Sequence, residues 1–480
     1  MDDSLAIRSG EEPSSAAASA EVAQAHLRHA IRFLRQSQFE QAIFHARSSV
    51  RFAHASWSGL EQLGLVLFRL GELFPLFFGV LLQASRNGQL KEQGLKTLSA
   101  LFESRGQHDQ ARVCIEAMAM LATVTGPSRL KPECPNVLCL RSVEQSMFRV
   151  KKNTQTGLYS LVFGGGHTSL KNVLDITEVN LFKATVLGDN LLSFNDLPRF
   201  DLIVNSLSCP DHDSRGLELI QRFLERSPHI PVINAPRHIS RTSRAENARR
   251  LGRLEHVSMP RTELFQCDQG FDRVISQFEQ AGFSYPVLVR RPGSHGANKM
   301  TKVDSSAALH DWLIGQQKIQ AFHVTSYVDY RWIDGFFHAF RAFFIDGEIY
   351  PVSHIISDHW EIHCDNSGLR DRHRLMSSDP SLQEQEKRFL ADPESCIGPN
   401  ALHALRQIQK SIGLDYFGVD FALDVSGDLI VFEANATMRQ HVADVGAFPY
   451  LRESVDRIAN AFMEMVRSRC LSSGGNGLVS

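Results

Sequence analysis

The sequence has few cysteines, and none of them stands in a C-x-x-C pair. The eight cysteines are scattered along 480 residues, and the closest two are Cys134 and Cys139. Disulfide-rich secreted domains and structural zinc sites depend on closely spaced cysteines, so the sequence argues against both. Scattered cysteines are typical of a reducing compartment, and we therefore expect a cytoplasmic protein.

The sequence also lacks a long, uninterrupted apolar segment. Its most apolar run, Leu63 to Leu82, is broken by Arg69, Glu72 and Pro75, whereas a membrane-spanning helix needs about 20 consecutive apolar residues. The first twenty residues are acidic and rich in alanine and serine, without the basic start and apolar centre of a secretory signal. We expect neither a signal peptide nor a membrane segment.

Charge of one sign does not dominate the sequence. Lysine and arginine together number 51 and aspartate and glutamate 53, which gives a formal net charge of −2. This balance provides no general attraction to nucleic acid or to an anionic membrane, and we expect neither as a partner. The composition, 43% hydrophobic and 22% charged, is that of an ordinary folded chain, long enough for about two to four domains.

The first part of the chain carries helical patterns and almost no strand signal. Similar short segments end at Ala42, Leu76 and Ala111, at spacings of 34 and 35 residues. These spacings match the period of tetratricopeptide helical hairpins. A plain helical bundle of similar length explains the weak repeat equally well, and both interpretations stay open. A helical array of either kind typically offers a groove to a peptide or protein, which is the partner we expect.

Changes in composition divide the rest of the chain. Gly126 to Cys139 is rich in proline and cysteine, which indicates a linker, and the texture becomes α/β from Leu158 onward. Leu158–Phe163, Phe200–Leu207 and Ile230–Pro236 are expected to be strands of a small parallel sheet. The predicted segments are 1–20 (disordered tail), 21–125 (tetratricopeptide-like helical domain), 126–155 (linker), 156–265 (small parallel α/β domain), 266–470 (C-terminal α+β domain) and 471–480 (disordered tail).

The C-terminal domain contains a predicted β-hairpin. Tyr416–Asp424 alternates apolar and polar residues, and Leu429–Asn435 resumes the strand after a turn. Ser426 and Gly427 form a plausible two-residue loop. With this loop, the strands pair residues whose numbers have a constant sum.

This register places Asp420 opposite Glu433, and Asn435 opposite Gly418 on the same face. Two opposed carboxylates repel each other and destabilise a hairpin, and a cation between them removes the repulsion. Two carboxylates and one amide are oxygen ligands that suit Mg²⁺ or Mn²⁺ shared with substrate phosphates. The alternative is a solvated hairpin whose polar face happens to carry acids.

Basic residues are candidates for binding phosphate. Arg290 ends a predicted strand and is followed by the glycine-bearing loop Gly293, Ser294, His295 and Gly296, whose backbone amides suit a phosphate. The alternative is a turn beside a surface arginine. Of the six arginines between positions 237 and 253, most are expected on a solvated helix face, and Arg244 is the first candidate to reach a phosphate.

An arginine and three histidines lie in and just after the predicted hairpin from His338 to Ser357. Arg341 lies in the middle of its first, apolar strand, where a buried guanidinium needs an anionic partner. His354, His359 and His363 follow at spacings that differ from the metalloprotease motif, in which glutamate directly follows the first histidine. A polar substrate pocket, unrelated loop histidines and a zinc site all remain open for these three residues.

Together these motifs resemble the ATP-grasp superfamily, in particular its glutathione synthetase and ribosomal-protein glutamate ligase branch. The resemblance covers roughly Asn234 to Arg467, the preceding α/β segment looks like the usual N-terminal domain of the family, and the helical repeat lies outside the resemblance. We therefore expect a multi-domain α and α/β protein: an N-terminal helical repeat, a small parallel α/β domain and a C-terminal ATP-grasp α+β domain. The resemblance itself implies the last of these. It implies an ATP-dependent ligase that phosphorylates a carboxylate and lets an amine attack the acyl phosphate. An ATP-grasp phosphotransferase and a non-catalytic nucleotide-binding scaffold are the alternatives.

The resemblance also implies a role for each matching residue. Arg341 resembles the arginine that grips the γ-phosphate and the acyl phosphate, and the three histidines at 354, 359 and 363 are expected at the substrate. Arg290 replaces the usual lysine, and Ser326 stands where glutamate is common. The implied Mg²⁺ or Mn²⁺ ligands are Asp420, Glu433 and Asn435. The implied ATP-binding residues are Arg290, Gly293, Ser294, His295, Gly296, Tyr327, Val328, Asp329 and Arg244.

Overall fold

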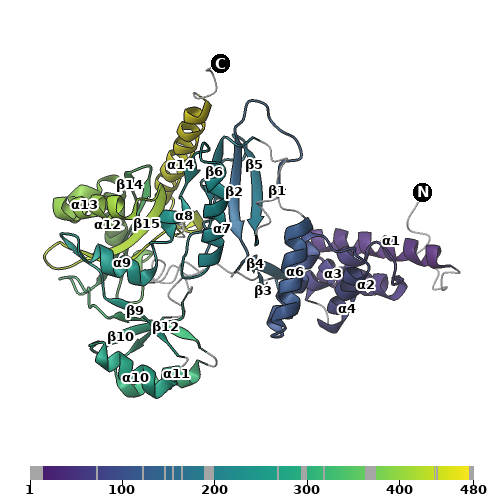
Figure 1. The fold of residues 1–480 in the computed structure, drawn as a ribbon, viewed down its shortest axis with the longest axis horizontal. Coiled ribbons are helices and arrows are strands. Elements are labelled where there is room, and N and C mark those ends of the chain that lie inside the picture. The colour runs from purple at the N-terminus through teal and green to yellow at the C-terminus, as the bar shows by residue number, and fades with distance from the viewer. Residues whose placement is uncertain are drawn as a thin grey trace. The chain divides into compact units, whose positions relative to one another are not determined.

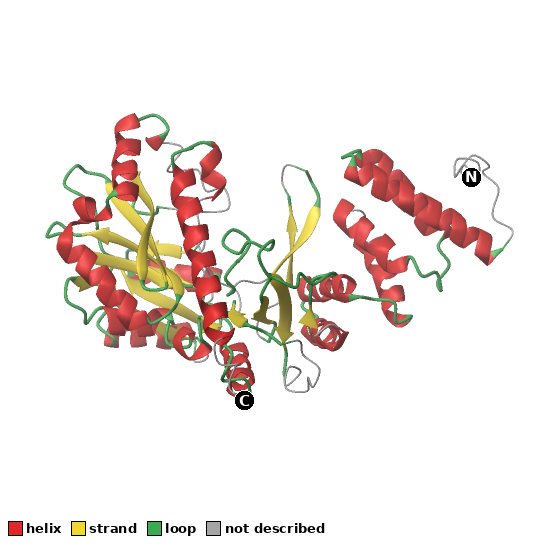
Figure 2. Cartoon of the chain, turned by 90° about the horizontal axis from the view of Figure 1, so that it is seen from above, coloured by secondary structure: helices red, strands yellow, loops and turns green. Residues whose placement is uncertain are grey.

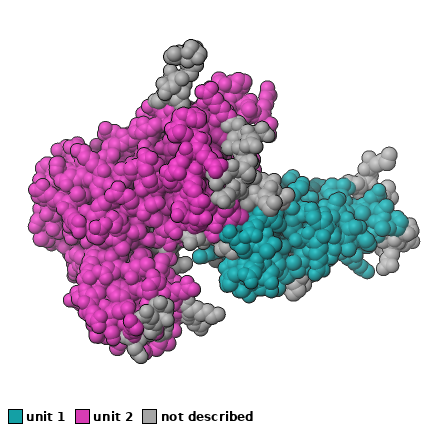
Figure 3. All heavy atoms as spheres, viewed as in Figure 1, with its two compact units in different colours: residues 1–123, 146–164 teal, residues 124–145, 165–480 magenta. Residues whose placement is uncertain are grey.

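The computed structural model divides the chain into two compact units. One unit comprises residues 1–123 and 146–164, and the other comprises 124–145 and 165–480 (Figure 3). The chain therefore enters the second unit, returns to the first and enters the second again. The described residues are 15–71, 74–121, 124–144, 148–153, 156–163, 166–188, 199–267, 270–292, 300–316, 319–362, 375–436, 438 and 442–474.

The first unit is built on helices that pack in consecutive pairs, α1 with α2, α3 with α4 and α5 with α6 (Figure 1). The Ser15 hydroxyl accepts a hydrogen bond from the amide of Ala18 and so begins α1, whereas α3 ends at Gly71 with a φ of 68°. The expected helices are present, and their tetratricopeptide-like character stays a prediction. Their bounds are α1 Ala16–Arg35, α2 Phe39–Phe52, α3 Leu60–Leu70, α4 Phe74–Arg86, α5 Glu92–Ser104 and α6 His108–Leu121.

Small side chains let α1 and α2 approach each other closely. Ala23 and Ala30 on α1, and Ala42 and Ala46 on α2, are fully buried. The hydroxyl of Ser49 donates a hydrogen bond of 2.8 Å to the carbonyl oxygen of Ala23, which joins the two helices directly. The first helical pair therefore has a fixed register.

Three histidines lie at the edge of this helical pair. The Nδ1 atoms of His26 and His45 are 2.9 Å apart, and the rings of His29 and His45 stack with their centroids 5.1 Å apart. Burial, and then the charges of His26 and His29, lower the pKa of His45 to about 4. Burial and the charge of His29 also lower the pKa of His26.

We expect the helical unit to lose stability between about pH 6.5 and pH 4. His45 has its ordinary pKa of 6.5 in the unfolded chain and a pKa of about 4 in the folded chain, so the unfolded state binds more protons in this window. The free energy of unfolding therefore falls as the pH falls, and the loss is complete below about pH 4. Circular dichroism during heating at pH 7.5 and pH 4.5 measures it. His45→Leu should weaken the pH dependence, and the exposed His108→Leu should not; equal slopes would contradict the assignment.

A short antiparallel hairpin, β3 Phe148–Lys152 with β4 Tyr159–Phe163, completes the first unit. Phe148 is buried, and β3 packs on α5. Tyr159 lies against Phe68 and fills the space beside Gly71, where a Cβ atom would come within 2.5 Å of its ring. The prediction that Leu158–Phe163 joins the parallel sheet is therefore wrong, because the aromatic side chains of this hairpin pack on the helices.

The second unit contains that parallel sheet, in the strand order β1-β5-β2-β6-β7. Only β1 is antiparallel to its neighbour. The predicted strands at 200–207 and 230–236 are present as β6 and β7, with α7 Ser214–Glu225 between them. The strands are β1 Val124–Thr125, β2 Asn136–Ser142, β5 Asn180–Val186, β6 Leu202–Asn205 and β7 Val232–Ile233.

The predicted linker at 126–155 is corrected by this sheet. Its residues 136–142 form β2, the central strand, which pairs with β5 on one side and β6 on the other. Val137, Leu138 and Leu140 are fully buried. A segment rich in proline and cysteine therefore leads directly into the core of the second unit.

A chain that begins at residue 155 is therefore expected to be insoluble, because it lacks the central strand of the sheet. A chain that begins at Val124, with residues 146–164 replaced by a short glycine–serine linker, keeps all five strands and should unfold cooperatively on heating. Soluble yield and calorimetry of the two chains measure the difference. A soluble, cooperatively folded chain from residue 155 would show that β2 is dispensable.

Two antiparallel sheets form the rest of the second unit. The smaller has the order β11-β10-β12-β9, and its core includes residues of α10 and α11. The larger has the order β14-β13-β15-β16-β8, in which only β8 is parallel to its neighbour. The strands are β8 Val257–Ser258, β9 Thr262–Gln266, β10 Val287–Arg290, β11 Met300–Val303, β12 Ala321–Ser326, β13 Phe337–Ile345, β14 Glu348–Ser357, β15 Tyr416–Leu423 and β16 Leu429–Asn435.

Helices cover both faces of the larger sheet (Figure 2). Phe340 and Phe421 pack with Phe389 of α12 on one face, and Phe343 and Tyr416 pack with α14 on the other. The chain therefore combines helices and several β-sheets in two units, in agreement with the expected mixed α/β class. In the part described, no helix has both the length and the apolar character to span a membrane. The remaining helices are α8 Pro236–Ile239, α9 Arg244–Leu251, α10 Phe271–Gln280, α11 Ser306–Gly315, α12 Pro380–Ala391, α13 Pro393–Ile412, η4 Val442–Gly446 and α14 Leu451–Gly474.

Candidate functional site

The β15–β16 hairpin has the predicted register at the candidate metal ligands. Asp420 pairs with Glu433, and Gly418 pairs with Asn435. The space opposite Asn435 is filled, because a Cβ atom on Gly418 would come within 2.7 Å of Phe343 and Met438. A side chain at position 418 would therefore collide with Phe343 and Met438, which explains the glycine by packing.

The loop of this hairpin differs from the prediction. The amide of Asp424 donates to the carbonyl oxygen of Asp428 at 2.9 Å, which closes a loop of three residues, not two. Gly427 has a φ of 83°, a conformation that glycine adopts without strain. A bulge leaves Phe432 as an extra residue between the pairs Asp420–Glu433 and Phe421–Val431. The extra residue offsets the longer loop, and the two acids still face each other.

Each of the two acids holds an arginine. Arg341 lies opposite Asp420 on the neighbouring strand β13. Its Nε and Nη2 atoms donate to the Oδ1 and Oδ2 atoms of Asp420 at 2.6 and 2.7 Å. Their side chains are 15% and 24% exposed, so this two-bond pair is largely removed from water. The anionic partner that the position of Arg341 requires is therefore Asp420. Glu433 accepts a hydrogen bond from Nη2 of Arg244.

Arg244 is held in place at the start of α9. The Ser243 hydroxyl caps this helix by accepting from the amide of Glu246. Asn247 anchors α9 on β16, because its Nδ2 atom donates to the carbonyl oxygen of Ala434 at 2.8 Å. The amide of Arg244 donates to Oδ2 of Asp211 at 3.3 Å. The guanidinium thus reaches Glu433 from a fixed backbone.

The smaller sheet contributes two buried basic side chains, Arg290 on β10 and His323 on β12, which lie directly opposite each other. Burial is the largest cause that lowers the pKa of Arg290 to about 10, and the charge of Arg244 lowers it further. The charge of Glu433 acts in the opposite direction. Arg290 therefore lies within electrostatic reach of the acids on the larger sheet.

These side chains form one group, which we call the charged cluster. It joins residues from both antiparallel sheets, from α9 and from the segment after β6. Asp211 and His323 were missed at the level of sequence. Asp211 follows the carboxyl end of a parallel strand, a place where ligands bind in α/β sheets, and that signal could have identified it. The cluster comprises Asp211, Arg244, Arg290, His323, Arg341, Asp420 and Glu433.

Of the three predicted substrate histidines, the structure describes His354 and His359. His354 is buried, and its ring stacks on that of Phe340 with the centroids 4.1 Å apart. Its Nε2 atom shares a hydrogen bond of 2.9 Å with Nδ1 of His338. Because side chains alternate along a strand, Phe340 and His354 face away from Arg341, toward α12. His354 therefore lies on the face of the sheet opposite to Arg341, and its role at a substrate stays a prediction. His359 is exposed in a loop, and His363 lies outside the described residues.

Of the other residues predicted to contact the nucleotide, the structure describes Tyr327, Val328 and Asp329. Tyr327 follows β12; its amide donates to the carbonyl oxygen of Pro286, and the ammonium of Lys302 lies 4.3 Å from the centre of its ring. Val328 is half-buried, and Asp329 accepts from the amide of Arg331. The loop Gly293, Ser294, His295 and Gly296 lies outside the described residues.

The donor set on the hairpin fits a magnesium ion. No group of three or more histidine, cysteine or acidic side chains that could hold a metal occurs among the residues placed by the structure. Magnesium is usually held by one or two carboxylates, with waters and substrate phosphates as its other ligands. Each carboxylate has about four lone-pair sites, and Arg341 uses two of those on Asp420. The chemistry of Asp420, Glu433 and Asn435 is therefore compatible with Mg²⁺.

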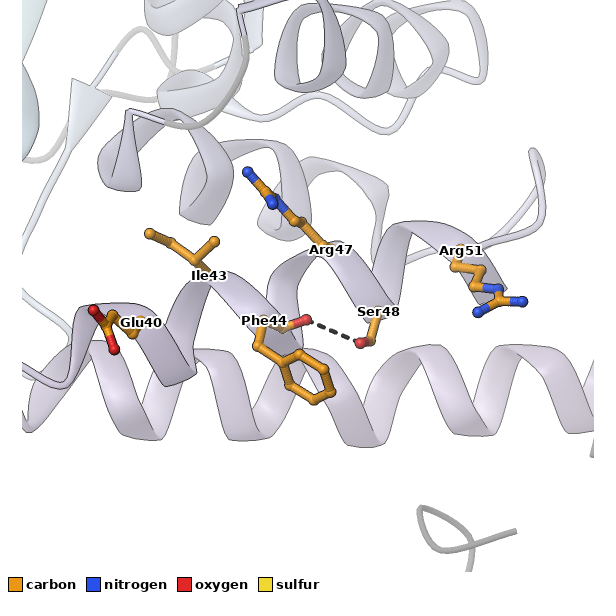
Figure 4. A pocket seen from close by; sticks show the side chains of 6 residues that line it. All are labelled: Glu40, Ile43, Phe44, Arg47, Ser48 and Arg51. Carbon is orange, nitrogen blue, oxygen red and sulfur yellow. Dashed lines mark hydrogen bonds between the residues drawn. The ribbon is translucent and has the colours of Figure 1, made fainter. Parts of the chain in front are cut away.

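A separate surface feature occurs on the helical unit. One side of α2 forms a shallow hollow in which the Phe44 side chain is 62% exposed and Arg47 and Arg51 are exposed (Figure 4). A second hollow on α1 is lined by Arg28, Ile31, Arg32, Arg35 and Gln36. None of the predicted site residues borders either hollow. The two helices thus present arginines beside apolar side chains.

No family model matches the chain, and no curated protein sequence matches it. D-alanine–D-alanine ligase from Bacillus anthracis, complexed with ATP, is 14% identical with a TM-score of 0.39, over 70% of this chain and 98% of that one. An ATP-grasp RimK domain protein from Sphaerobacter thermophilus is 11% identical with a TM-score of 0.38, over 68% and 99%. The ATP-grasp ligase PsnB, complexed with a precursor variant, Mg and ADP, is 11% identical with a TM-score of 0.37, over 69% and 99%.

Proposed function

We propose that this protein is an ATP-dependent carboxylate–amine ligase of the ATP-grasp type, which acts through an acyl phosphate. The observation that carries the proposal is the pairing of Asp420 with Glu433 on adjacent strands, with Arg341 bound to Asp420 from the next strand. Two acids and an arginine at one place on a sheet provide both a cation site and a phosphate contact. Arg290, on the other antiparallel sheet, supplies a second positive charge.

In this proposal the residues of the hairpin hold the cofactors. Asp420, Glu433 and Asn435 would hold Mg²⁺ or Mn²⁺, which would supply positive charge to offset that of the transferring phosphoryl group. Arg341 directs its guanidinium toward the same group, where its planar fork suits two phosphate oxygens. Arg290 and Arg244 hold the other phosphates. The residues position the reactants and offset charge, and none of them forms a covalent bond.

The substrate that supplies the carboxylate or the amine is proposed to be a peptide or protein bound by the helical unit. The hollow on α2 offers the exposed Phe44 between Arg47 and Glu40, and Arg51 extends the positive charge. Arg32, Arg35 and Arg51 have no ion-pair partner among the described residues. An acidic segment with an aromatic or aliphatic anchor has the complementary chemistry. We place the reaction in the cytoplasm.

The experiment that tests the function is a screen for ADP release with panels of carboxylates and amines. Release that depends on both an acid and an amine is expected for a ligase. Release with one acceptor alone would identify a phosphotransferase, and binding of ATP without turnover would identify a scaffold. The same screen with Asp420→Asn shows whether the activity belongs to the charged cluster.

A further inference from the structure

His323 is a buried histidine whose ring has no visible function in the fold. Its side chain is 2% exposed, and neither ring nitrogen has a hydrogen-bond partner among the described residues. The Nε2 atom is 3.8 Å from Oδ2 of Asp211, which is too long for a hydrogen bond. A buried polar ring without partners destabilises a protein. The adjacent Phe322 and Val324 point to the opposite face of the sheet, into an apolar core that does not include His323. Packing alone does not account for a histidine here.

The surroundings of His323 are those of an anion site. The charged groups that act on the ring are Asp211, Arg244 and Arg290. Arg290 lies directly opposite His323 on β10 and is itself buried, so both side chains stand on the same face of the smaller sheet. Two guanidinium groups and one imidazole therefore converge here, with Asp211 acting on the ring and Glu433 on the two arginines. A ligand with several negative charges matches this set.

We propose that His323 is a phosphate-binding residue, which donates a hydrogen bond to an oxygen of the nucleotide polyphosphate held by Arg290 and Arg244. This inference rests on the proposed nucleotide-binding function and assigns to the site a donor that the sequence motifs do not contain. The Nε2 atom of the ring is the atom that approaches Asp211. A small movement of the ring closes the 3.8 Å separation to a hydrogen bond.

The two partners of the ring imply that binding takes up a proton. Asp211 and the phosphate both accept hydrogen bonds, and a neutral imidazole has only one N–H to donate, whereas the imidazolium has two. Without a ligand, burial is the largest cause that lowers the pKa of His323 to about 4, and the charges of Arg244 and Arg290 lower it further, whereas Asp211 raises it. A bound polyphosphate adds negative charge beside the ring and raises this pKa. The proton comes from the solvent.

The test is calorimetric titration of the full chain with Mg²⁺ and ADP at pH 6.5, in two buffers of different ionisation enthalpy. The wild type should take up part of a proton on binding. His323→Leu, which removes both ring nitrogens, should bind ADP roughly 10- to 100-fold more weakly, as expected when a hydrogen bond to a charged group is lost. It should also take up correspondingly less of a proton. His323→Asn keeps a donor that does not titrate, so it should recover affinity without the proton. His310→Leu, on α11, is the matched control.

The outcomes separate this inference from the proposed function. Equal affinity and equal proton uptake in the wild type, His323→Leu and His323→Asn would overturn the role of His323 and leave nucleotide binding intact. A wild-type chain that binds no ADP with Mg²⁺ would overturn both. If His323→Leu does not fold, the comparison of the wild type with His323→Asn still decides, because only the wild type should take up the proton.

Discussion

Replacing Glu433 with glutamine is expected to lower turnover roughly 1,000-fold while the chain stays folded. Glu433 faces Asp420 across the hairpin and is one of the two acids proposed to hold the magnesium ion. The amide of glutamine keeps the size of the side chain but loses its negative charge. A bound metal ion supplies several kcal/mol of transition-state stabilisation, which corresponds to a rate factor of about this size. Release of ADP under saturating substrates measures the effect.

The same substitution tests how the two acids are held. Two opposed acids without partners would repel each other, and removing one of them would raise the melting temperature. In the structure Glu433 is paired with Arg244, and Asp420 with Arg341, so Glu433→Gln should instead lower stability, by at most about 1 kcal/mol. Glu218→Gln is the matched control, because Glu218 pairs with Arg215 on α7. Normal turnover by Glu433→Gln would show that the hairpin does not hold a catalytic metal.

The hairpin shows what a local pattern can and cannot determine. Alternating side chains identified both strands, and the pairing of Asp420 with Glu433 was correct although the loop has three residues rather than two. The bulge at Phe432 added the residue that the predicted register needed. Nothing in the sequence around Phe432 marks a bulge, which forms because both strands keep their apolar faces in the core on either side of it.

Features that depend on distant segments were not predictable. The composition of the segment that contains β2 predicts a linker. The strand forms because it pairs with β5 and β6, which lie far along the chain. Asp211 and His323 enter the charged cluster only because different elements meet there. The face of the sheet on which His354 lies is decided by its pairing with Phe340 on the neighbouring strand. The spacing between histidines in the sequence does not contain this information. Local periodicity therefore predicts helices and strands, whereas the composition of the charged cluster depends on contacts between segments that are distant in the sequence.

Replacing Arg341 with lysine is expected to lower kcat roughly 100-fold or more, with little change in the affinity for ADP. Arg341 stands mid-strand, in a two-bond pair with Asp420 that is largely removed from water. Lysine keeps the charge but has no planar fork, so it cannot contact two phosphate oxygens or both oxygens of Asp420 at once. Losing one preorganised charge-stabilising contact has this size of effect in enzymes. Single-turnover ADP formation measures the chemical step.

Arg290→Ala should fail in a different way. Arg290 is buried on the smaller sheet beside His323, in the position proposed for the phosphates that are not transferred. Its loss should weaken binding of ADP itself, measured by calorimetry.

Arg467→Lys is the matched control for Arg341→Lys. Arg467, on the surface of α14, also donates two hydrogen bonds to one acid, Glu178. It should leave both kcat and affinity unchanged.

A titration with Mg²⁺ separates two roles for Arg341. If the guanidinium contacts the transferring phosphoryl group, the deficit of Arg341→Lys persists at saturating Mg²⁺. If it only orients Asp420 as a metal ligand, a higher concentration of Mg²⁺ restores the rate, because weakened metal binding is overcome by mass action. The bidentate contact with Asp420 makes both roles geometrically possible. We expect the deficit to persist; full recovery would move Arg341 from the phosphate to the metal, and an unfolded Arg341→Lys beside a normal Arg290→Ala would make the pair with Asp420 purely structural.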